Sequence, residues 1–192
     1  DFEAVQFGVP IWAGTRPFQQ ICFQFSLHTL HTDGDLDHQE YLDLSGADPS
    51  AAFAQALIAA CGAEPRTIFV YNAGFEKTRI GELAERFPDL TAPLQALKDR
   101  IVDLMPIVKN RYYHPRQEGS WSIKNVLPVL VPELKYSDLD GVQDGTLAIL
   151  AYQEVIAPDT TAARKQEIER QLRQYCQLDT YSMVKIWQAF AR

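Results

Sequence analysis

The segment LRQYCQLDTYSMVKIW, residues 172–187, has the spacing of an amphipathic helix but carries an aspartate on its apolar side. Apolar residues recur at steps of three and four along the helix expected over residues 160–191, and Asp179 falls inside that series. At about 100° per residue, positions four apart differ by about 40°, so Tyr175 and Asp179 project from one face. This helix is therefore expected to bring a phenol and a carboxylate to one point in the core.

Two other predicted elements also direct carboxylates inward. Glu76 begins an apolar series on the helix expected over residues 74–87. In the opening strand, expected over residues 1–8, side chains alternate between two faces, and Asp1 and Glu3 share a face with apolar residues. Four acidic side chains, from one strand and two helices, are thus predicted to face the core.

Each of these patterns also has a purely structural interpretation. Asp1 and Glu3 would fit the solvated end of a strand, and Glu76 would favour the dipole of a helix capped by Asn72. Tyr175 would fit an ordinary core aromatic. A functional site is indicated because all four acids face the core together, from one strand and two helices.

The spacing Tyr-x-x-x-Asp is a weak signal when taken alone. It occurs a second time in YSDLD, from Tyr136 to Asp140, but no helical apolar series surrounds that copy. We therefore set the second copy aside and keep Tyr175 and Asp179.

Clustered carboxylates in a protein core need a compensating partner. An unpaired buried carboxylate costs several kcal/mol and like charges repel, so such a cluster persists only with protonation, basic partners or bound cations. Oxygen ligands without paired cysteines or a histidine cluster suit Mg²⁺ or Mn²⁺ better than Zn²⁺. Two such ions about 4 Å apart are the usual arrangement for attack of water on a phosphodiester. The pattern predicts phosphoryl hydrolysis.

The rest of the chain alternates between strand and helix patterns. Further strands are expected over residues 19–30, 37–43 and 66–72, and further helices over residues 49–62, 89–100, 122–130 and 144–156. A basic, aromatic loop is expected over residues 109–119. Three antiparallel strands followed by alternating helices and strands predict an α/β fold, with a mixed sheet flanked by helices.

Bulk composition limits the class of protein. The 192 residues are 46% hydrophobic and carry a net charge of −7, which fits one globular domain over residues 1–192. There is no run of about 18 apolar residues and no secretory leader, and three scattered cysteines argue against a disulfide framework or a thiolate zinc site. These features predict a soluble, cytoplasmic protein. The start at Asp1, already in a strand pattern, suggests a domain taken from a longer chain, with part of the first strand missing.

The acidic residues and their surroundings resemble the DEDD, or DnaQ-like, 3′-5′ exonuclease superfamily of the ribonuclease H-like fold. The first motif of that family, Asp-x-Glu on the first strand, is matched by Asp1 to Glu3. The second, an Asn-containing turn with an acid at a helix start, is matched by YNAGFE, residues 71–76. The third, Tyr-x-x-x-Asp, is matched by Tyr175 to Asp179. Position 174 is Gln, where the histidine subclass has His, so the chain is similar to the tyrosine subclass.

The resemblance implies a two-metal 3′-5′ exonuclease that hydrolyses single-stranded DNA or RNA. Asp1, Glu3, Glu76 and Asp179 would hold two Mg²⁺ or Mn²⁺ ions, and Tyr175 would orient the attacking water. Glu76 stands where the family usually has Asp, so the effect of the longer side chain on activity is open. Asp103 would be a reserve ligand, or else a residue that caps a strand end or helix.

The residues expected to contact a nucleic-acid strand are Asn72, Lys109, Arg111, Ser122 and Lys124. A solvated, turn-rich loop is the alternative for the residues between 109 and 119. More narrowly, RPFQQICFQFSLH, YNAGFEKTRI, GSWSIKNVLP and YCQLDT resemble an uncharacterised bacterial ribonuclease H-like domain family, often fused to an upstream RecB-like nuclease domain. Such a linked domain would be a covalent partner.

Two other functions agree with the same residues. One is a nucleic-acid-binding module of a larger nuclease that kept the fold but lost turnover, with Glu76 as the mark of that loss. The other is a metal-dependent hydrolase of nucleotides or other small phosphoesters. Related folds host several activities, so the resemblance alone does not choose among them.

Overall fold

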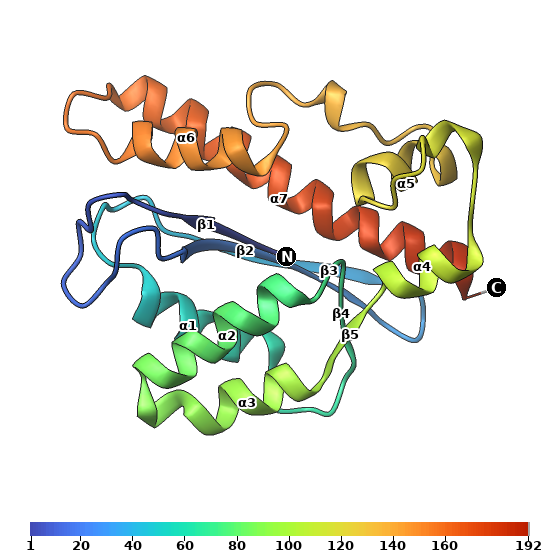
Figure 1. Ribbon diagram of the computed structural model, residues 1–192, viewed down its shortest axis with the longest axis horizontal. Coiled ribbons are helices and arrows are strands. Elements are labelled where there is room, and N and C mark those ends of the chain that lie inside the picture. The colour runs from blue at the N-terminus through green and yellow to red at the C-terminus, as the bar shows by residue number, and fades with distance from the viewer. Residues whose placement is uncertain (192) are drawn as a thin grey trace.

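Three N-terminal strands form an antiparallel sheet in the order β1-β2-β3 in the computed structural model, which describes residues 1–191. The strands are β1 (Phe2–Val5), β2 (Ile21–Leu30) and β3 (Leu36–Leu42). Alternation along β1 sends Phe2 and Ala4 into one hydrophobic core and Val5 into another, so β1 is buried on both faces. The sheet therefore lies between two helical layers (Figure 1).

The two layers are built from different parts of the chain. One face of the sheet is covered by α1 (Ser50–Cys61), α2 (Gly74–Arg86) and α3 (Thr91–Asp99). The opposite face is covered by α6 (Gly145–Val155) and α7 (Ala162–Phe190) (Figure 1). Phe53 of α1 packs on Phe2 and Phe25, and Tyr152 of α6 packs on Phe23. Each layer thus buries aromatic side chains directly against the sheet.

The two remaining strands do not join this sheet. β4 (Ile68–Val70) and β5 (Ile101–Asp103) pair in parallel as a separate two-stranded sheet. The α/β class, the antiparallel meander and the presence of parallel strands are as predicted. β5 was not predicted as a strand, and the prediction of one continuous mixed sheet is wrong. A cavity of about 830 Å³ separates the β2 segment that continues past β1 from the edge of β4, and no strand among residues 1–191 bridges them.

The segment after β5 also differs from the expectation. α4 (Met105–Arg111) and α5 (Ile123–Leu130) pack near the C-terminal part of α7, joined by a connection with a short 3₁₀ turn, Pro115–Gln117. Lys109 and Arg111 therefore lie in the last turn of a helix and not in the predicted loop. Pro106 in the first turn favours a helix start, and Val108 is buried against α5 and α7.

Candidate metal centre

The first strand brings two carboxylates toward α7. Glu3 is buried and Asp1 is partly buried, and both point to the same face of β1. The register of β1 against β2 shifts between Glu3 and Ala4, which pair with Gln24 and Cys22. Such bulges bend a strand locally and redirect its side chains. The shift occurs at the residue that carries one of the predicted ligands.

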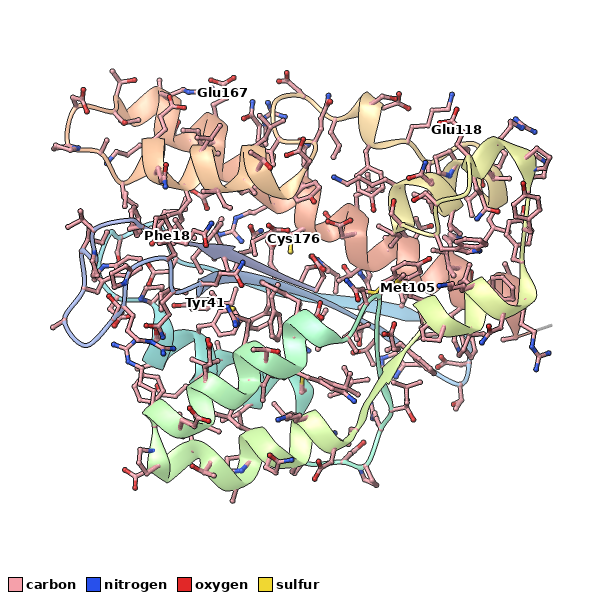
Figure 2. The ribbon with its side chains drawn as sticks, in the orientation of Figure 1. Phe18, Tyr41, Met105, Glu118, Glu167 and Cys176 are labelled. Carbon is pink, nitrogen blue, oxygen red and sulfur yellow. The ribbon has the colours of Figure 1, made fainter. Side chains whose placement is uncertain are left out.

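The last helix places a thiol and a third carboxylate opposite this strand. Cys176 and Asp179 are both buried on the face of α7 that meets the sheet, and Cys176 lies between the helix and the sheet (Figure 2). Asp1, Glu3 and Cys176 each offer one ligand atom, and these atoms lie within 4.8 Å of one another. The Cys176 thiol donates to Asp1 Oδ2 at 3.8 Å. Asp1 and Glu3 thus converge as predicted, with a cysteine beside them.

Burial dominates the electrostatics of the site. Burial, followed by the charge of Asp179, raises the pKa of Glu3 to about 8, while the positive charges of the N-terminal amine and of Lys124 partly offset this. Burial also raises the pKa of Asp179, against hydrogen bonds from Tyr136 and Tyr175 and the charge of Lys124. The charge of Asp179 therefore disfavours ionisation of Glu3, and burial disfavours ionisation of both carboxyl groups.

Glu76, in the first turn of α2, lies close enough to Glu3 for its charge to affect the pKa of Glu3. It is buried, its Oε2 has no hydrogen-bond partner among the described residues, and burial followed by the Asp103 carboxylate raises its pKa. Its charge contributes to the raised pKa of Glu3. Glu76 and Asp179 nonetheless lie outside the group formed by Asp1, Glu3 and Cys176. The four acids share one region without forming a closed ligand shell.

The turn before α2 is held differently from the expectation. The predicted cap by Asn72 is wrong, because α2 begins after Ala73 and no side chain caps it. Asn72 instead adopts a left-handed backbone with φ of 67°, which asparagine tolerates better than most residues. Asp103 accepts the backbone N–H of Asn72 at 2.9 Å, of Ala73 at 3.0 Å and of Met105 at 2.9 Å. Asp103 therefore connects the ends of the strands to the starts of the following helices, which is the capping role that the sequence also allowed.

Tyr136 contacts the acidic centre, although its copy of the Tyr-x-x-x-Asp spacing was not expected to belong to a site. It lies in a 3₁₀ turn, Tyr136–Asp138, yet it is buried, and its hydroxyl donates to Asp179 Oδ1 at 2.5 Å. Its ring meets that of Tyr175, with centroids 6.2 Å apart. The Tyr-x-x-x-Asp spacing there is indeed not helical, and no local pattern links a turn to a helix 43 residues away. Cys176, in contrast, could have been found, because it lies on the same apolar face of the helix as Asp179.

The residues predicted to contact nucleic acid divide into two groups. Asn72, Lys109, Arg111 and Ser122 are exposed. Lys124 instead turns inward, with Nζ 5.2 Å from the ring centroid of Tyr136 and 5.3 Å from that of Tyr175. It donates to the backbone carbonyl of Gln143 at 2.8 Å. Lys124 therefore belongs to the acidic centre and not to an outer basic surface.

The donor set fits a hard divalent cation. Within residues 1–191, no lysine, arginine or histidine forms a salt bridge with Asp1, Glu3, Glu76 or Asp179. Burial and the charge of Glu3 raise the pKa of the Cys176 thiol, which favours its neutral form in the metal-free protein. Most of the potential donors are carboxylate oxygens, which suit Mg²⁺ or Mn²⁺, and Cys176 adds one sulfur beside them.

The chain matches one described family. Residues 1–122 match the profile of a domain of unknown function, DUF2779. The chain belongs to this family. The matched region of the DUF2779 chain contains Asp1, Glu3 and Glu76 but ends before Tyr175 and Asp179. No curated protein and no solved structure matches the chain. No helix among residues 1–191 is long and apolar enough to cross a membrane.

Proposed function

We propose that this DUF2779 chain is a divalent-metal-dependent nuclease that removes nucleotides from the 3′ ends of single-stranded DNA or RNA. The observation that carries the proposal is the convergence of buried carboxylates that have no basic salt-bridge partner among residues 1–191. Glu3, Glu76 and Asp179 all have raised pKa values because of burial, and one Glu76 oxygen has no partner among the described residues. Bound cations would relieve this unfavourable arrangement.

Asp1, Glu3, Glu76 and Asp179 would hold two Mg²⁺ or Mn²⁺ ions. When bound, a pair of such ions supplies positive charge to the attacking and leaving oxygens of an in-line displacement at phosphorus. Hard cations accept oxygen ligands from carboxylates and usually keep several waters.

The protein's own residues would position the reacting groups. Tyr136 holds Asp179 through its hydroxyl. Burial and the charge of Asp179 raise the pKa of Tyr175, so its hydroxyl stays protonated. Tyr175 would therefore orient a water by hydrogen bonding and not remove its proton. Lys124 uses one Nζ donor on Gln143, and its remaining donors would be available for a phosphate oxygen.

An exposed surface beside the site has the chemistry for a single strand. Lys109 and Arg111 occupy the last turn of α4, and Lys109 Nζ lies 5.7 Å from the ring centroid of Trp121. Tyr113 is 66% exposed, which makes it available for stacking on a base. Trp121 is an anchor, since its indole donates to Tyr112 O and its own carbonyl accepts from Tyr71. Lys109 and Arg111 would contact phosphates, while the Tyr113 ring would stack on a base.

The test compares two aspartates that both follow a tyrosine by four positions. With a 5′-labelled single strand and Mn²⁺, Asp179→Asn is expected to lower the rate at least about 100-fold, because a buried ligand is lost. Asp140→Asn is the matched control, since Asp140 is exposed and pairs only with Arg170 on the surface, where salt bridges contribute little. Equal activity of Asp179→Asn and wild type, with circular dichroism confirming both folds, would refute the assignment.

A second candidate is a binding module without turnover. The position of Glu76 outside the Asp1, Glu3 and Cys176 group favours it. The discriminating variant is Glu76→Asp, which places the shorter acid at this position. Tight binding of single strands by wild type without hydrolysis in Mg²⁺ or Mn²⁺, and turnover gained by Glu76→Asp, would support the binding module. Hydrolysis confined to nucleotides or other small phosphoesters would instead indicate a small-substrate hydrolase.

A further inference from the structure

A cysteine lies among the carboxylates of the acidic centre and has no part in the hydrolysis proposed above. Asp1, Glu3 and Cys176 each offer one ligand atom, and the three atoms lie within 4.8 Å of one another. Asp1 and Glu3 are two positions apart in extended chain and so share a face, and Cys176 is buried on α7. Two carboxylates and one thiol therefore converge from a strand and a helix.

Glu3 is the member of this group that lacks a partner. It is 7% exposed, and its carboxylate takes part in no hydrogen bond or salt bridge within residues 1–191. Its ligand atom is directed toward Asp1 and Cys176, but the thiol hydrogen of Cys176 is donated to Asp1. A buried carboxylate without a partner is unfavourable. A cation at the centre of the three donors would give Glu3 its missing partner.

The spacing of the donors agrees with a mixed sulfur and oxygen shell. A tetrahedral ion with bonds of about 2.3 Å to sulfur and about 2.0 Å to oxygen holds these two donors about 3.5 Å apart. Cys176 Sγ lies 3.8 Å from Asp1 Oδ2. Side-chain shifts of about 1 Å or less would bring all three donors to such distances. Asp1 also lines the large cavity, which gives a cation a path to the group.

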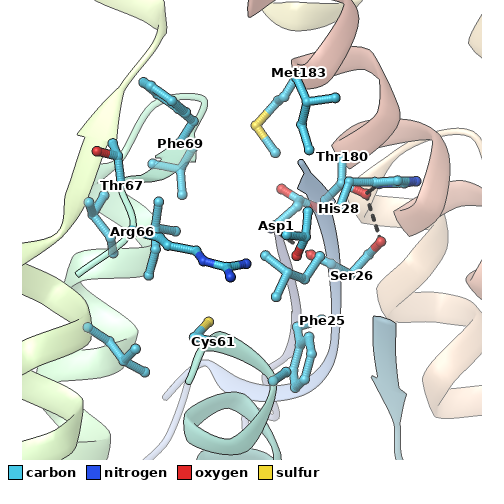
Figure 3. A pocket seen from close by; sticks show the side chains of 18 of the residues that line it. Asp1, Phe25, Ser26, His28, Cys61, Arg66, Thr67, Phe69, Thr180 and Met183 are labelled. Atoms are coloured by element: carbon cyan, nitrogen blue, oxygen red, sulfur yellow. Dashed lines mark hydrogen bonds between the residues drawn. The ribbon is translucent and has the colours of Figure 1, made fainter. Parts of the chain in front are cut away.

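The strand and the helix are fixed to each other beside these donors. Ser26 N donates to Asp1 O at 3.1 Å, and the Ser26 hydroxyl lies 2.7 Å from that of Thr180. Thr180 follows Cys176 by one helical turn, and its hydroxyl also lies 2.8 Å from His28 Nδ1. Ser26, His28 and Thr180 lie together beside Asp1 in Figure 3. The fold therefore sets the distance between Asp1 and Cys176 before an ion binds.

We propose that Asp1, Glu3 and Cys176 form a site for one thiophilic divalent cation of the Zn²⁺ class. Thiolate is a soft ligand that selects Zn²⁺ and related ions, whereas Mg²⁺ takes oxygen ligands. On binding, the thiol proton of Cys176 passes to water and a sulfur electron pair forms the bond to the metal, since a coordinating thiol is deprotonated. A water would complete a four-coordinate shell.

This site would make the acidic centre sensitive to the identity of the metal. With a thiophilic ion bound, Asp1 and Glu3 would no longer be free to hold two hard cations, so Zn²⁺ would inhibit hydrolysis. That consequence rests on the proposed function, whereas the binding of the ion does not.

Cobalt(II) absorption tests the sulfur ligand directly, because a bond from Co²⁺ to thiolate adds a charge-transfer band in the near ultraviolet. All proteins carry Cys61→Ser, which removes the partly exposed thiol that lines the cavity. The band is expected to saturate at one Co²⁺ per chain, to be lost in Cys176→Ser and to persist in Cys22→Ser. Cys22 is the matched control, since it is buried in the core on the α1 and α2 side of the sheet. No band, or an equal band in Cys176→Ser, would overturn the proposal.

A second comparison changes a carboxylate and leaves Cys176 in place. Glu3→Gln should weaken Co²⁺ binding at least about ten-fold, because even the loss of a partner outside the ligand shell typically costs that much. Glu85→Gln, at an exposed position of α2, should leave the affinity unchanged. Circular dichroism shows whether each variant is folded, and this comparison decides alone if Cys176→Ser is not. Equal affinity of the two glutamine variants would also overturn the proposal.

Displacement of Mn²⁺ separates this inference from the proposed function. Zn²⁺ should release bound Mn²⁺, measured by electron paramagnetic resonance of the free ion, and Cys176→Ser should require at least about ten-fold more Zn²⁺. An equal Zn²⁺ requirement in both proteins would count against the sulfur ligand. A cobalt–sulfur band without hydrolysis in any metal would support the site and refute the nuclease. Hydrolysis in Mn²⁺ without that band would support the nuclease and refute the site.

Discussion

Asp179 is held by residues from three separate segments. Tyr136 donates to its Oδ1, Tyr175 lies one turn before it on α7, and Lys124 sits over both tyrosine rings. Each contact lowers the cost of keeping this buried carboxylate ionised, in opposition to burial. Tyr136 therefore contributes to the placement of Asp179 in the acidic centre.

Tyr136→Phe tests this dependence with the loss of one oxygen atom. Hydrogen bonds to charged groups contribute about 1.5 to 3 kcal/mol, so the free energy of unfolding should fall by about that amount. Mn²⁺-dependent hydrolysis should fall about ten-fold or more, because Asp179 loses its orientation. Tyr113→Phe, at an exposed tyrosine, is the control for both measurements. Identical stability and rate for the two variants would show that Tyr136 does not position Asp179.

Glu3 gives the metal-free protein a pH dependence of defined sign. Its pKa rises from an ordinary 4.5 to about 8 on folding, so the folded chain binds more protons than the unfolded chain between those values. The stability that protonated Glu3 contributes to the folded chain is therefore fully present below pH 4.5. It is lost as the pH rises through 8.

Denaturant unfolding in EDTA at pH 5 and pH 8 measures this effect. Wild type should lose on the order of a few kcal/mol more than Glu3→Gln over that interval, since Gln does not titrate. Saturating Mn²⁺ should reduce the difference, because a bound cation favours the ionised carboxylate. The same pH slope in both proteins without metal would contradict the assignment to Glu3.

At the scale of elements, Asp103 connects β4 and β5 to the helices that follow them. Its carboxylate accepts three backbone N–H groups, from Asn72, Ala73 and Met105. These contacts fix the start of α2, which presents Glu76, and the start of α4, which presents Lys109. One side chain thus sets the placement of two functional elements.

Asp103→Ala leaves these three donors without their acceptor. The expected loss of unfolding free energy is about 2 to 4 kcal/mol, the range for removing several hydrogen bonds to a charged group at helix ends. Asp99→Ala is the control, because Asp99 is exposed and accepts only from Gln95. Thermal and denaturant unfolding of both variants gives the comparison, and equal destabilisation would contradict the capping role.

Local periodicity was sufficient for most of the helices and for the inward direction of Glu76 and Asp179, but not for β5 or α4. The apolar series on α7 predicted that Asp179 would be buried, and the series on α2 predicted the same for Glu76, because both patterns lie within one helix. The Tyr136 contact with Asp179 spans 43 residues and that of Asp103 with Asn72 spans 31, and no periodic pattern encodes them. The split of the sheet was also missed, because strand pairing depends on contacts between distant segments.

At the scale of the whole molecule, the balance of charge is unfavourable for a nucleic-acid partner. The net charge of −7 means that any strand must approach through a local basic surface. Lys109 and Arg111 lie together on α4, at the same end of the molecule as α5 and the C-terminal part of α7 (Figure 1). A nucleic-acid path would thus lead across α4 toward the acidic centre.

Neutralising both cations, as Lys109→Gln with Arg111→Gln, should weaken binding of a single strand. The slope of log affinity against log salt should decrease by about 1.4, since each phosphate contact to a single strand contributes about 0.7. Lys98→Gln with Lys165→Gln removes the same charge from α3 and from the start of α7, away from α4. If both pairs change the slope equally, the effect is one of net charge and α4 is not the contact surface.

The most direct measurement of the central claim is an anomalous difference map from crystals of the protein soaked in Mn²⁺. The account predicts two peaks among the carboxylates of Asp1, Glu3, Glu76 and Asp179, and their loss in Asp179→Asn crystals soaked identically. A map with no peak at these carboxylates, or with Mn²⁺ bound only at surface acids, would contradict the account.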